Sequence, residues 1–270
     1  MPLITSLQNA RVKDAIKLRD RRAREKQGRV LIDGARELRR AMEAQIELHE
    51  LFVCRELCHS EDADAVLELA DDARAEVLEV TPPVFEKLAF GERAEGVLGV
   101  ARPPQRTLAD LQLPENPLVA VLEGVEKPGN VGAVLRSADA AGVSAVVVAD
   151  GGTDLYNPNT IRASLGTIFT VPVCGASSRE TLAWLRVHGL HIVTSRVDAA
   201  IRYTAAPLAG PTAIVLGAES FGLSEMWRGD DVTEVSLPML GVADSLNVST
   251  TAAVLFYEAL RQRANAGNPM

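Results

Sequence analysis

The sequence has few of the residues that a disulfide framework, a metal site or a membrane segment requires. Its 270 residues include three cysteines, and an odd number at irregular spacing indicates reduced thiols rather than disulfides. Cys54, Cys58 and His59 do not have the spacing of a zinc site, and no second ligand pair follows them, so we predict no metal. No apolar run approaches the length of a membrane span and no signal peptide opens the chain, so we predict a cytoplasmic protein.

The net charge of −8 is unevenly distributed along the chain. Residues 1–40 hold 12 Lys and Arg against 5 Asp and Glu, a net of +7, whereas the remaining 230 residues carry a net of −15. Such asymmetry is typical of a localised polyanion-binding face, although a solvated charged helix would produce it too. The candidate nucleic-acid contacts at this end are Arg11, Lys13, Lys17, Arg19, Arg21, Arg22 and Arg24.

Two α/β regions flank a proline-rich stretch. Residues 1–101 alternate short strands and helices, beginning with a basic helix over residues 9–26. Residues 102–117 contain four prolines, which interrupt regular structure and predict a linker. Residues 118–270 start with an apolar strand at 118–122 and continue as alternating strands and helices. This alternation predicts a parallel sheet with helices on both faces.

The stretch VSLPMLGVADSLNVSTTAAVLFYEAL, residues 235–260, places polar side chains where a strand ends and a helix begins. The strand breaks at Pro238, and Ser245, Asn247 and Ser249 lead into an alanine-rich helix. One such side chain suffices as an N-cap, and three exceed that role. Ligands of α/β folds bind where the carboxyl ends of strands face helix starts, so this stretch is a candidate site, with helix capping as the alternative.

A glycine-containing loop, EKPGNVG at residues 126–132, follows the first strand of the second region. Asn130 is expected at the start of the next helix, where it is either a cap or a functional group. Arg136 follows among small apolar residues, and a buried charge there would need a partner, so a structural ion pair is one interpretation. The glycines do not form the G-x-G-x-x-G pattern, which makes a nicotinamide site the weaker alternative.

Three segments, in this order along the chain, resemble the signature motifs of the SpoU/TrmH family of RNA ribose 2′-O-methyltransferases, which belong to the SPOUT class. They are residues 126–132 with Arg136, AIVLGAESFGL at 213–223, and LPMLGVADSLNVSTTAAVLFYEA at 237–259. The amino-terminal segment RVLIDGARE, residues 29–37, resembles the substrate-binding domain of the same family. The resemblance implies a SPOUT trefoil-knot α/β catalytic domain with a parallel sheet, preceded by a smaller L30e-like α/β domain.

The resemblance also implies roles for individual residues. Arg136 would act near the ribose 2′-hydroxyl, with Glu219 as its counter-charge. The full set of implied catalytic residues is Arg136, Asn130, Glu219, Ser245 and Asn247. The implied contacts of the cofactor, S-adenosylmethionine, are Gly217, Leu237 and Leu246, with Leu216, Met239 and Thr194 lining the same pocket. A further family-like segment, at residues 157–169, contains Arg162, which would contact RNA phosphate or pair internally.

The implied function is methylation of a ribose 2′-hydroxyl in RNA. The L30e-like domain favours 23S ribosomal RNA, with tRNA or a non-catalytic RNA-binding role as alternatives. No histidine lies in the motifs, so Arg136 would remove the proton itself or orient a phosphate oxygen that does so. Family members work as homodimers packed through their catalytic domains, and the apolar residues Val254, Leu255 and Leu260 of the last helix are expected to support such a dimer.

Overall fold

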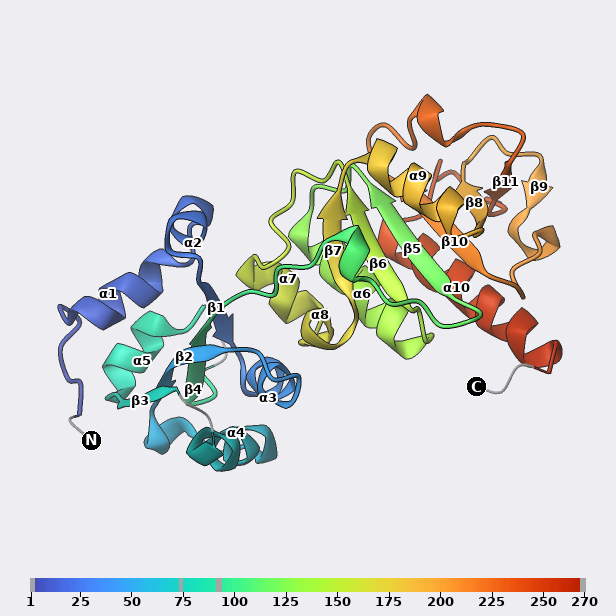
Figure 1. Ribbon diagram of the computed structural model, residues 1–270. Helices are drawn as coiled ribbons and strands as arrows, with labels where there is room; N and C mark the ends of the chain where they lie inside the picture. The colour runs from blue at the N-terminus through green and yellow to red at the C-terminus, as the bar shows by residue number, and fades with distance from the viewer. Residues whose placement is uncertain (1–2, 73–74, 91–93, 268–270) are drawn as a thin grey trace. The chain divides into compact units, whose positions relative to one another are not determined.

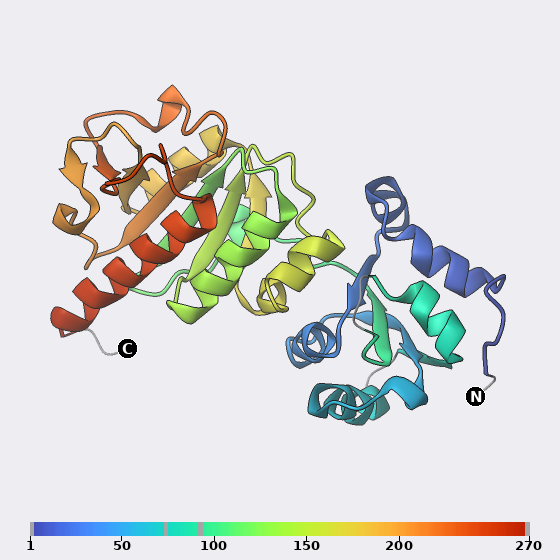
Figure 2. The ribbon, with the colours of Figure 1, turned by 180° about the vertical axis from the view of Figure 1, so that it is seen from behind.

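The computed structural model describes residues 3–72, 75–90 and 94–267 of the chain. They form two compact units, each with its own sheet (Figures 1 and 2). Unit 1 comprises residues 1–104 and 156–170, and unit 2 comprises residues 105–155 and 171–270. Residues 156–170 therefore pack with unit 1, although their place in the sequence is between two strands of unit 2.

Unit 1 is built on a mixed sheet in the order β1-β4-β2-β3. β4 runs antiparallel to β1 and β2, and β3 runs parallel to β2. The strands are β1 (Val30–Asp33), β2 (Leu48–Val53), β3 (Glu76–Glu79) and β4 (Val97–Ala101). The helices are α1 (Ala10–Lys17), α2 (Arg21–Gln27), α3 (Ala35–Glu43), α4 (Glu61–Asp72), α5 (Pro82–Leu88), α7 (Pro158–Ala163) and α8 (Thr167–Thr170).

The single basic helix predicted over residues 9–26 is wrong, because α1 and α2 are separate helices. Asp20 explains why a new helix, α2, begins at Arg21. Its side chain accepts the backbone N–H of Arg22 at 2.8 Å and so caps α2. The apolar side of α1 joins the core of unit 1, in which Val12, Phe52 and Phe85 are fully buried.

Unit 2 contains a seven-stranded sheet in the order β7-β6-β5-β10-β8-β11-β9. Each neighbouring pair of strands is parallel, which confirms the predicted parallel sheet. The strands are β5 (Leu118–Glu123), β6 (Ala145–Ala149), β7 (Val173–Ala176), β8 (His191–Ser195), β9 (Ile201–Arg202), β10 (Thr212–Gly217) and β11 (Val232–Ser236). The helices are α6 (Pro128–Ala140), α9 (Ser178–Val187) and α10 (Val248–Asn265).

Helices cover both faces of this sheet. α6 and α10 pack against each other on one face, and α9 lies on the other (Figures 1 and 2). The central strands β5 and β6 are buried along their whole length, which explains why they appear in the sequence as continuous apolar runs. Among the described residues, no helix has the length and apolarity needed to cross a bilayer.

The parallel strands end at a common edge of the sheet. β5 and β10 pair residue for residue, so Glu123 and Gly217 stand side by side at their carboxyl ends. β8 pairs with β10 on the other side and ends at Ser195. The segments that leave this edge carry all three motifs, and the carboxyl edge is where α/β sheets bind ligands.

Candidate functional site

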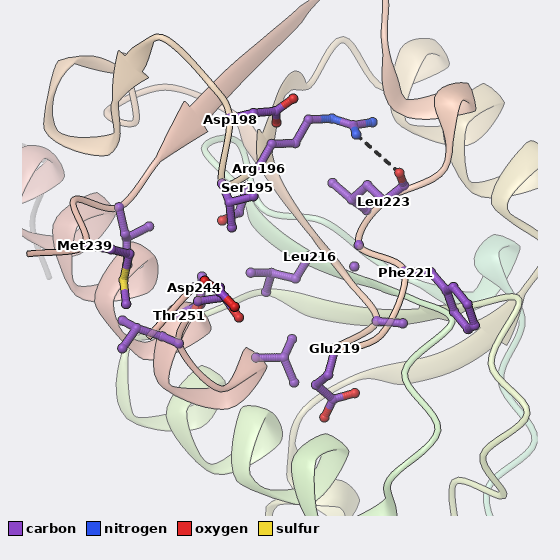
Figure 3. A pocket seen from close by; sticks show the side chains of 18 of the residues that line it. Ser195, Arg196, Asp198, Leu216, Glu219, Phe221, Leu223, Met239, Asp244 and Thr251 are labelled. Carbon is purple, nitrogen blue, oxygen red and sulfur yellow. Dashed lines mark hydrogen bonds between the residues drawn. The ribbon is translucent and has the colours of Figure 1, made fainter. Parts of the chain in front are cut away.

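A cavity of about 500 Å³ lies at the carboxyl edge of the unit 2 sheet (Figure 3). Its walls come from the end of β8 and residues 196–198 after it, the end of β10 and the turn that follows, the segment 237–246, and the start of α10. This volume is in the range of small-molecule sites. The walls combine aliphatic side chains such as Leu216 with exposed polar groups such as Asp244 and Ser245, so the cavity suits a ligand with apolar and polar ends.

Five of the six residues predicted to hold the cofactor line this cavity. They are Leu216, Gly217, Leu237, Met239 and Leu246. The sixth, Thr194, is fully buried in β8 next to Ser195, which does line the cavity. The Thr194 hydroxyl has no hydrogen-bond partner among the described residues. The cofactor role of all six stays a prediction, and the fold brings five of them to one cavity.

Gly217, an implied cofactor contact, has a structural role in the turn after β10. A Cβ atom on Gly217 would collide with the Gly222 carbonyl group and lie 2.5 Å from the Leu223 nitrogen. The turn after β10 folds back over Gly217, with Ala218 bridged to Gly222. The glycine therefore permits the backbone turn that builds the cavity wall.

Two residues absent from the sequence-based prediction hold this wall in place. The buried carboxylate of Glu123 accepts the Ser224 backbone N–H and the Ser224 hydroxyl, both at 2.7 Å. Just after β8, Arg196 donates to the Leu223 carbonyl at 3.2 Å (Figure 3) and to the Ser224 carbonyl at 2.8 Å. An acidic residue ending an otherwise apolar strand was the signal that could have identified Glu123.

Three of the predicted catalytic side chains are connected by hydrogen bonds. The Asn130 side-chain amide donates to the Glu219 carboxylate, and the Asn247 amide donates to the Asn130 Oδ1 atom at 3.3 Å. Asn247 also caps α10, since its Oδ1 accepts the Ser249 N–H at 2.9 Å. Asn130 does not cap α6, which begins at Pro128 and has Lys127 at its N-cap. The fourth residue, Ser245, is exposed and lines the cavity.

Arg136 lies apart from this chain of hydrogen bonds. The predicted pairing with Glu219 is wrong, since the Glu219 carboxylate accepts from Asn130 and Arg136 is exposed. Six residues along an α-helix correspond to roughly 9 Å of rise and a turn of about 120° away from the Asn130 face. The small apolar neighbours Val134, Leu135 and Ala138 are buried on the sheet side of α6 and leave the arginine outside. Within the described part of the chain, its guanidinium has no ion pair or hydrogen bond.

The basic side chains near the amino terminus are largely engaged within unit 1. Arg11 forms ion pairs with Glu50 and Glu76 at 2.9 and 2.6 Å. Lys17 pairs with Asp14 at 2.8 Å, and Arg21 pairs with Glu25 at the same distance. Lys13 and Arg22 are exposed, so they remain the clearest candidates for phosphate contacts.

Two of the arginines predicted to bind RNA support the fold instead. Arg24 is only 4% exposed and donates to the Leu18 carbonyl at 2.7 Å, so it is not part of an exposed basic surface. Arg19 donates to the carbonyls of residues 87, 88 and 89, and its guanidinium lies 5.8 Å from the Phe90 ring centre. These carbonyls end α5, where a cation is favourable.

Arg162 makes the internal pair that was one of its two predicted roles. Its guanidinium lies 3.1 Å from the Asp33 carboxylate, which also accepts the Phe90 N–H at 2.6 Å. Burial raises the pKa of Asp33 from 3.8 to about 6 despite these two favourable contacts. Burial likewise raises the pKa of Glu37, which lines a small cavity with Arg162.

Both regions of the chain match known protein families. Residues 117–257 match the SpoU rRNA Methylase family, and residues 9–99 match the MRM3-like substrate binding domain. The first match contains the first two motifs and residues 237–257 of the third, and the second contains the basic residues of α1 and α2.

Similar proteins include ribosomal RNA methyltransferases. The 23S rRNA (guanosine(2553)-2′-O)-methyltransferase RlmP of Bacillus subtilis is 28% identical over 95% of this chain and 98% of its own. The crystal structure of an RNA 2′-O ribose methyltransferase is 43% identical, with a TM-score of 0.85 over 97% of this chain and 100% of that one. The SpoU methyltransferase AviRb from Streptomyces viridochromogenes, in complex with AdoMet, is 29% identical, with a TM-score of 0.84 over 95% and 99% of the two chains.

Proposed function

Because this protein belongs to the SpoU rRNA methylase family, we propose that it transfers a methyl group from S-adenosylmethionine to a ribose 2′-hydroxyl of 23S ribosomal RNA. Family membership agrees with the resemblance found in the three motifs. The observation that carries the proposal is the cavity at the carboxyl edge, whose walls come from the second and third motifs. The first motif borders it through the hydrogen bond between Asn130 and Glu219. The names of the RlmP and AviRb proteins support the reaction, the RNA and the cofactor.

The residues of the cavity fit S-adenosylmethionine. Leu216, Leu237 and Leu246 would pack against its adenine ring, and Ser245 would bind its methionine end. When bound, the cofactor supplies an electrophilic methyl group. The chain must then align the ribose hydroxyl with that methyl group and assist loss of the hydroxyl proton. Asn130 and Asn247 would orient the ribose, and the hydrogen bonds that hold their side chains support this role.

Arg136 is the residue that we assign to proton removal, acting through a phosphate of the RNA. An arginine stays protonated in proteins and so does not itself accept the proton. An unpaired guanidinium instead forms bidentate hydrogen bonds to a phosphate. We therefore expect Arg136 to hold a phosphate whose free oxygen accepts the 2′-hydroxyl proton.

We also propose that the protein is a homodimer packed through the catalytic domain, with α10 at the interface. Leu255, expected to contribute to the dimer face, is fully buried within the protomer and does not contribute. Tyr257 is 51% exposed on α10, and Val254 and Leu260 are partly exposed there. A second copy would cover this surface.

The match of unit 1 to a substrate-binding domain supports its assignment to RNA binding. A ribosomal RNA substrate supports a location in the cytoplasm.

The test is to incubate the purified protein with labelled S-adenosylmethionine and either 23S rRNA or total tRNA. We expect label in 23S rRNA only, and nucleoside mass spectrometry should show a 2′-O-methyl ribose. Comparison of rRNA from a strain with and without the protein then locates the modified nucleotide. Methylation of tRNA alone, or of a base rather than a ribose, would overturn the proposal. A light-scattering mass of one chain would exclude the dimer.

A further inference from the structure

The turn after β10 places an aromatic ring on the protein surface beside the cavity. Ala218 and Gly222 form an isolated antiparallel bridge, and the Gly222 N–H donates to the Ala218 carbonyl at 2.9 Å. Only Glu219, Ser220 and Phe221 lie between them, and Gly222 closes the turn with a φ of 67°. A turn this tight gives its three tip residues defined positions.

Phe221 is 88% exposed, whereas Glu219 on the same turn is hydrogen-bonded to Asn130. Figure 3 shows the ring at the rim of the cavity, directed away from its centre. An aromatic side chain carries about 150–250 Å² of surface, and exposing it contributes almost no burial to folding. By contrast, Trp227, a few residues further on, is completely buried in the core of unit 2. Stability of the protomer therefore does not explain the position of Phe221.

We propose that Phe221 is the stacking platform for the base of the nucleotide that is methylated. This inference rests on the proposed function. The carbon that bears the 2′-hydroxyl is bonded directly to the carbon that bears the base, so the base lies close to the point of transfer. Because the cofactor would fill the interior of the cavity, the base must lie at its rim, where the ring of Phe221 is free.

The charge on the turn favours a base over the RNA backbone as the occupant. The Glu219 carboxylate lies two residues from Phe221 and disfavours a phosphate at this position. A base is uncharged, and aromatic side chains stack on unpaired bases of any sequence. A base within an RNA helix is already stacked on its neighbours, so the target nucleotide is in a loop or bulge, or is flipped out of a helix.

The experiment compares Phe221→Ala and Phe221→Trp with the wild-type protein on a short RNA that contains the methylated nucleotide. Loss of one stacking contact should raise the KM for RNA by roughly tenfold or more in Phe221→Ala. Phe221→Trp should remain near wild type, and its indole fluorescence should be quenched when the RNA binds. The affinity for S-adenosylmethionine, measured by calorimetry, should change in neither variant. Val187→Ala on α9 removes another exposed apolar side chain and serves as the control.

The decisive measurement uses an RNA whose target nucleotide lacks its base but keeps its ribose. On this RNA, wild-type protein and Phe221→Ala should have equal KM values, because no base is left to stack. An undiminished difference between them, or no difference on the intact RNA, would overturn the inference. A shift of Phe221→Ala to a smaller assembly in light scattering would also overturn it, by assigning the ring to a second copy of the chain. If the wild-type protein methylates no RNA, the proposed function itself fails.

Discussion

The two units differ in how many of their candidate binding residues already have partners within the protein. We compare the basic side chains of unit 1 with the predicted catalytic side chains of unit 2. In unit 1, Arg11, Arg19 and Arg24 all bind carboxylates or main-chain carbonyls of the same unit. In unit 2, Arg136 on α6 and Ser245 at the cavity are exposed, whereas Arg196, which lines the cavity, is hydrogen-bonded to main-chain carbonyls. The three arginines named in unit 1 thus sustain the fold, as Arg196 does in unit 2, whereas Arg136 is available to a ligand. The number of charges in a segment does not show which of the two roles applies.

The largest expected effect is that of removing the unpaired Arg136. Arg136→Ala should lower kcat by about two orders of magnitude or more, the scale of a lost acid–base contribution. The melting temperature and the affinity for S-adenosylmethionine should not change, because the side chain is exposed and has no partner in the described chain. Arg179→Ala, at an exposed arginine of α9, is the matched control. Near-normal turnover by folded Arg136→Ala would show that Arg136 has no part in catalysis.

The next effect concerns the backbone that shapes the cavity. Gly217→Ala would force the Gly222–Leu223 backbone away from β10, so we expect S-adenosylmethionine to bind about tenfold to a hundredfold more weakly. The RNA contacts that we assign to unit 1 should persist, whereas the contact that we assign to Phe221, on the displaced turn, should weaken. Gly210→Ala provides a control, since a Cβ atom there meets nothing within 4 Å. Calorimetry that finds equal cofactor affinity in both variants would place the cofactor elsewhere.

A smaller effect is expected from a buried charge in unit 1. The Asp33 pKa is about 6 in the folded state and 3.8 as the ordinary value, so the folded protein binds the proton more tightly. The free energy of unfolding should therefore fall by on the order of 2 kcal/mol as the pH rises from 4 to 6. Above pH 6 it should level off. Asp33→Asn cannot ionise and should lose this part of the slope. Urea unfolding of both proteins between pH 4.5 and 8 measures the difference, and parallel curves would contradict it.

The smallest effects are expected from substitutions of basic residues in unit 1, and they should differ between exposed and buried residues. Replacing Lys13 and Arg22 by Glu should weaken RNA binding severalfold and reduce the slope of log affinity against log salt by about two. Arg24→Gln should instead lower the free energy of unfolding by about 1–3 kcal/mol, because a buried carbonyl loses its donor. Its salt slope should match the wild type. A flatter slope in Arg24→Gln would show that burial does not keep this arginine from RNA.

Point substitutions test the role of unit 1 in RNA binding better than removal of the whole unit. α7 packs on β1 and α8 packs on α3, although both helices follow β6 in the sequence. A chain that starts after residue 105 would leave these helices without their packing partners. Loss of activity in such a chain would then report misfolding as readily as loss of RNA binding.

Local patterns in the sequence were sufficient to predict most of the strands and helices. Apolar runs such as residues 118–122 and 145–148 became buried parallel strands, because a strand covered on both faces needs apolar side chains at every position. The break between α1 and α2 was missed because Asp20 competes locally with helix continuation by capping a new start. The motifs located the cavity because parallel strands bring their carboxyl ends to one edge.

What the sequence alone determined is the alternation of elements, the parallel sheet, the family and the segments that surround the cavity. These follow from periodicity and from contiguous motifs. Only the tertiary structure decided which charges are free. Arg24 and Arg136 have the same side chain, yet one is buried and the other exposed, because partners distant in sequence set the environment of each. The trefoil knot stays a prediction from the family, since neither hydrophobic periodicity nor strand order in the sheet encodes the path of a chain through a loop.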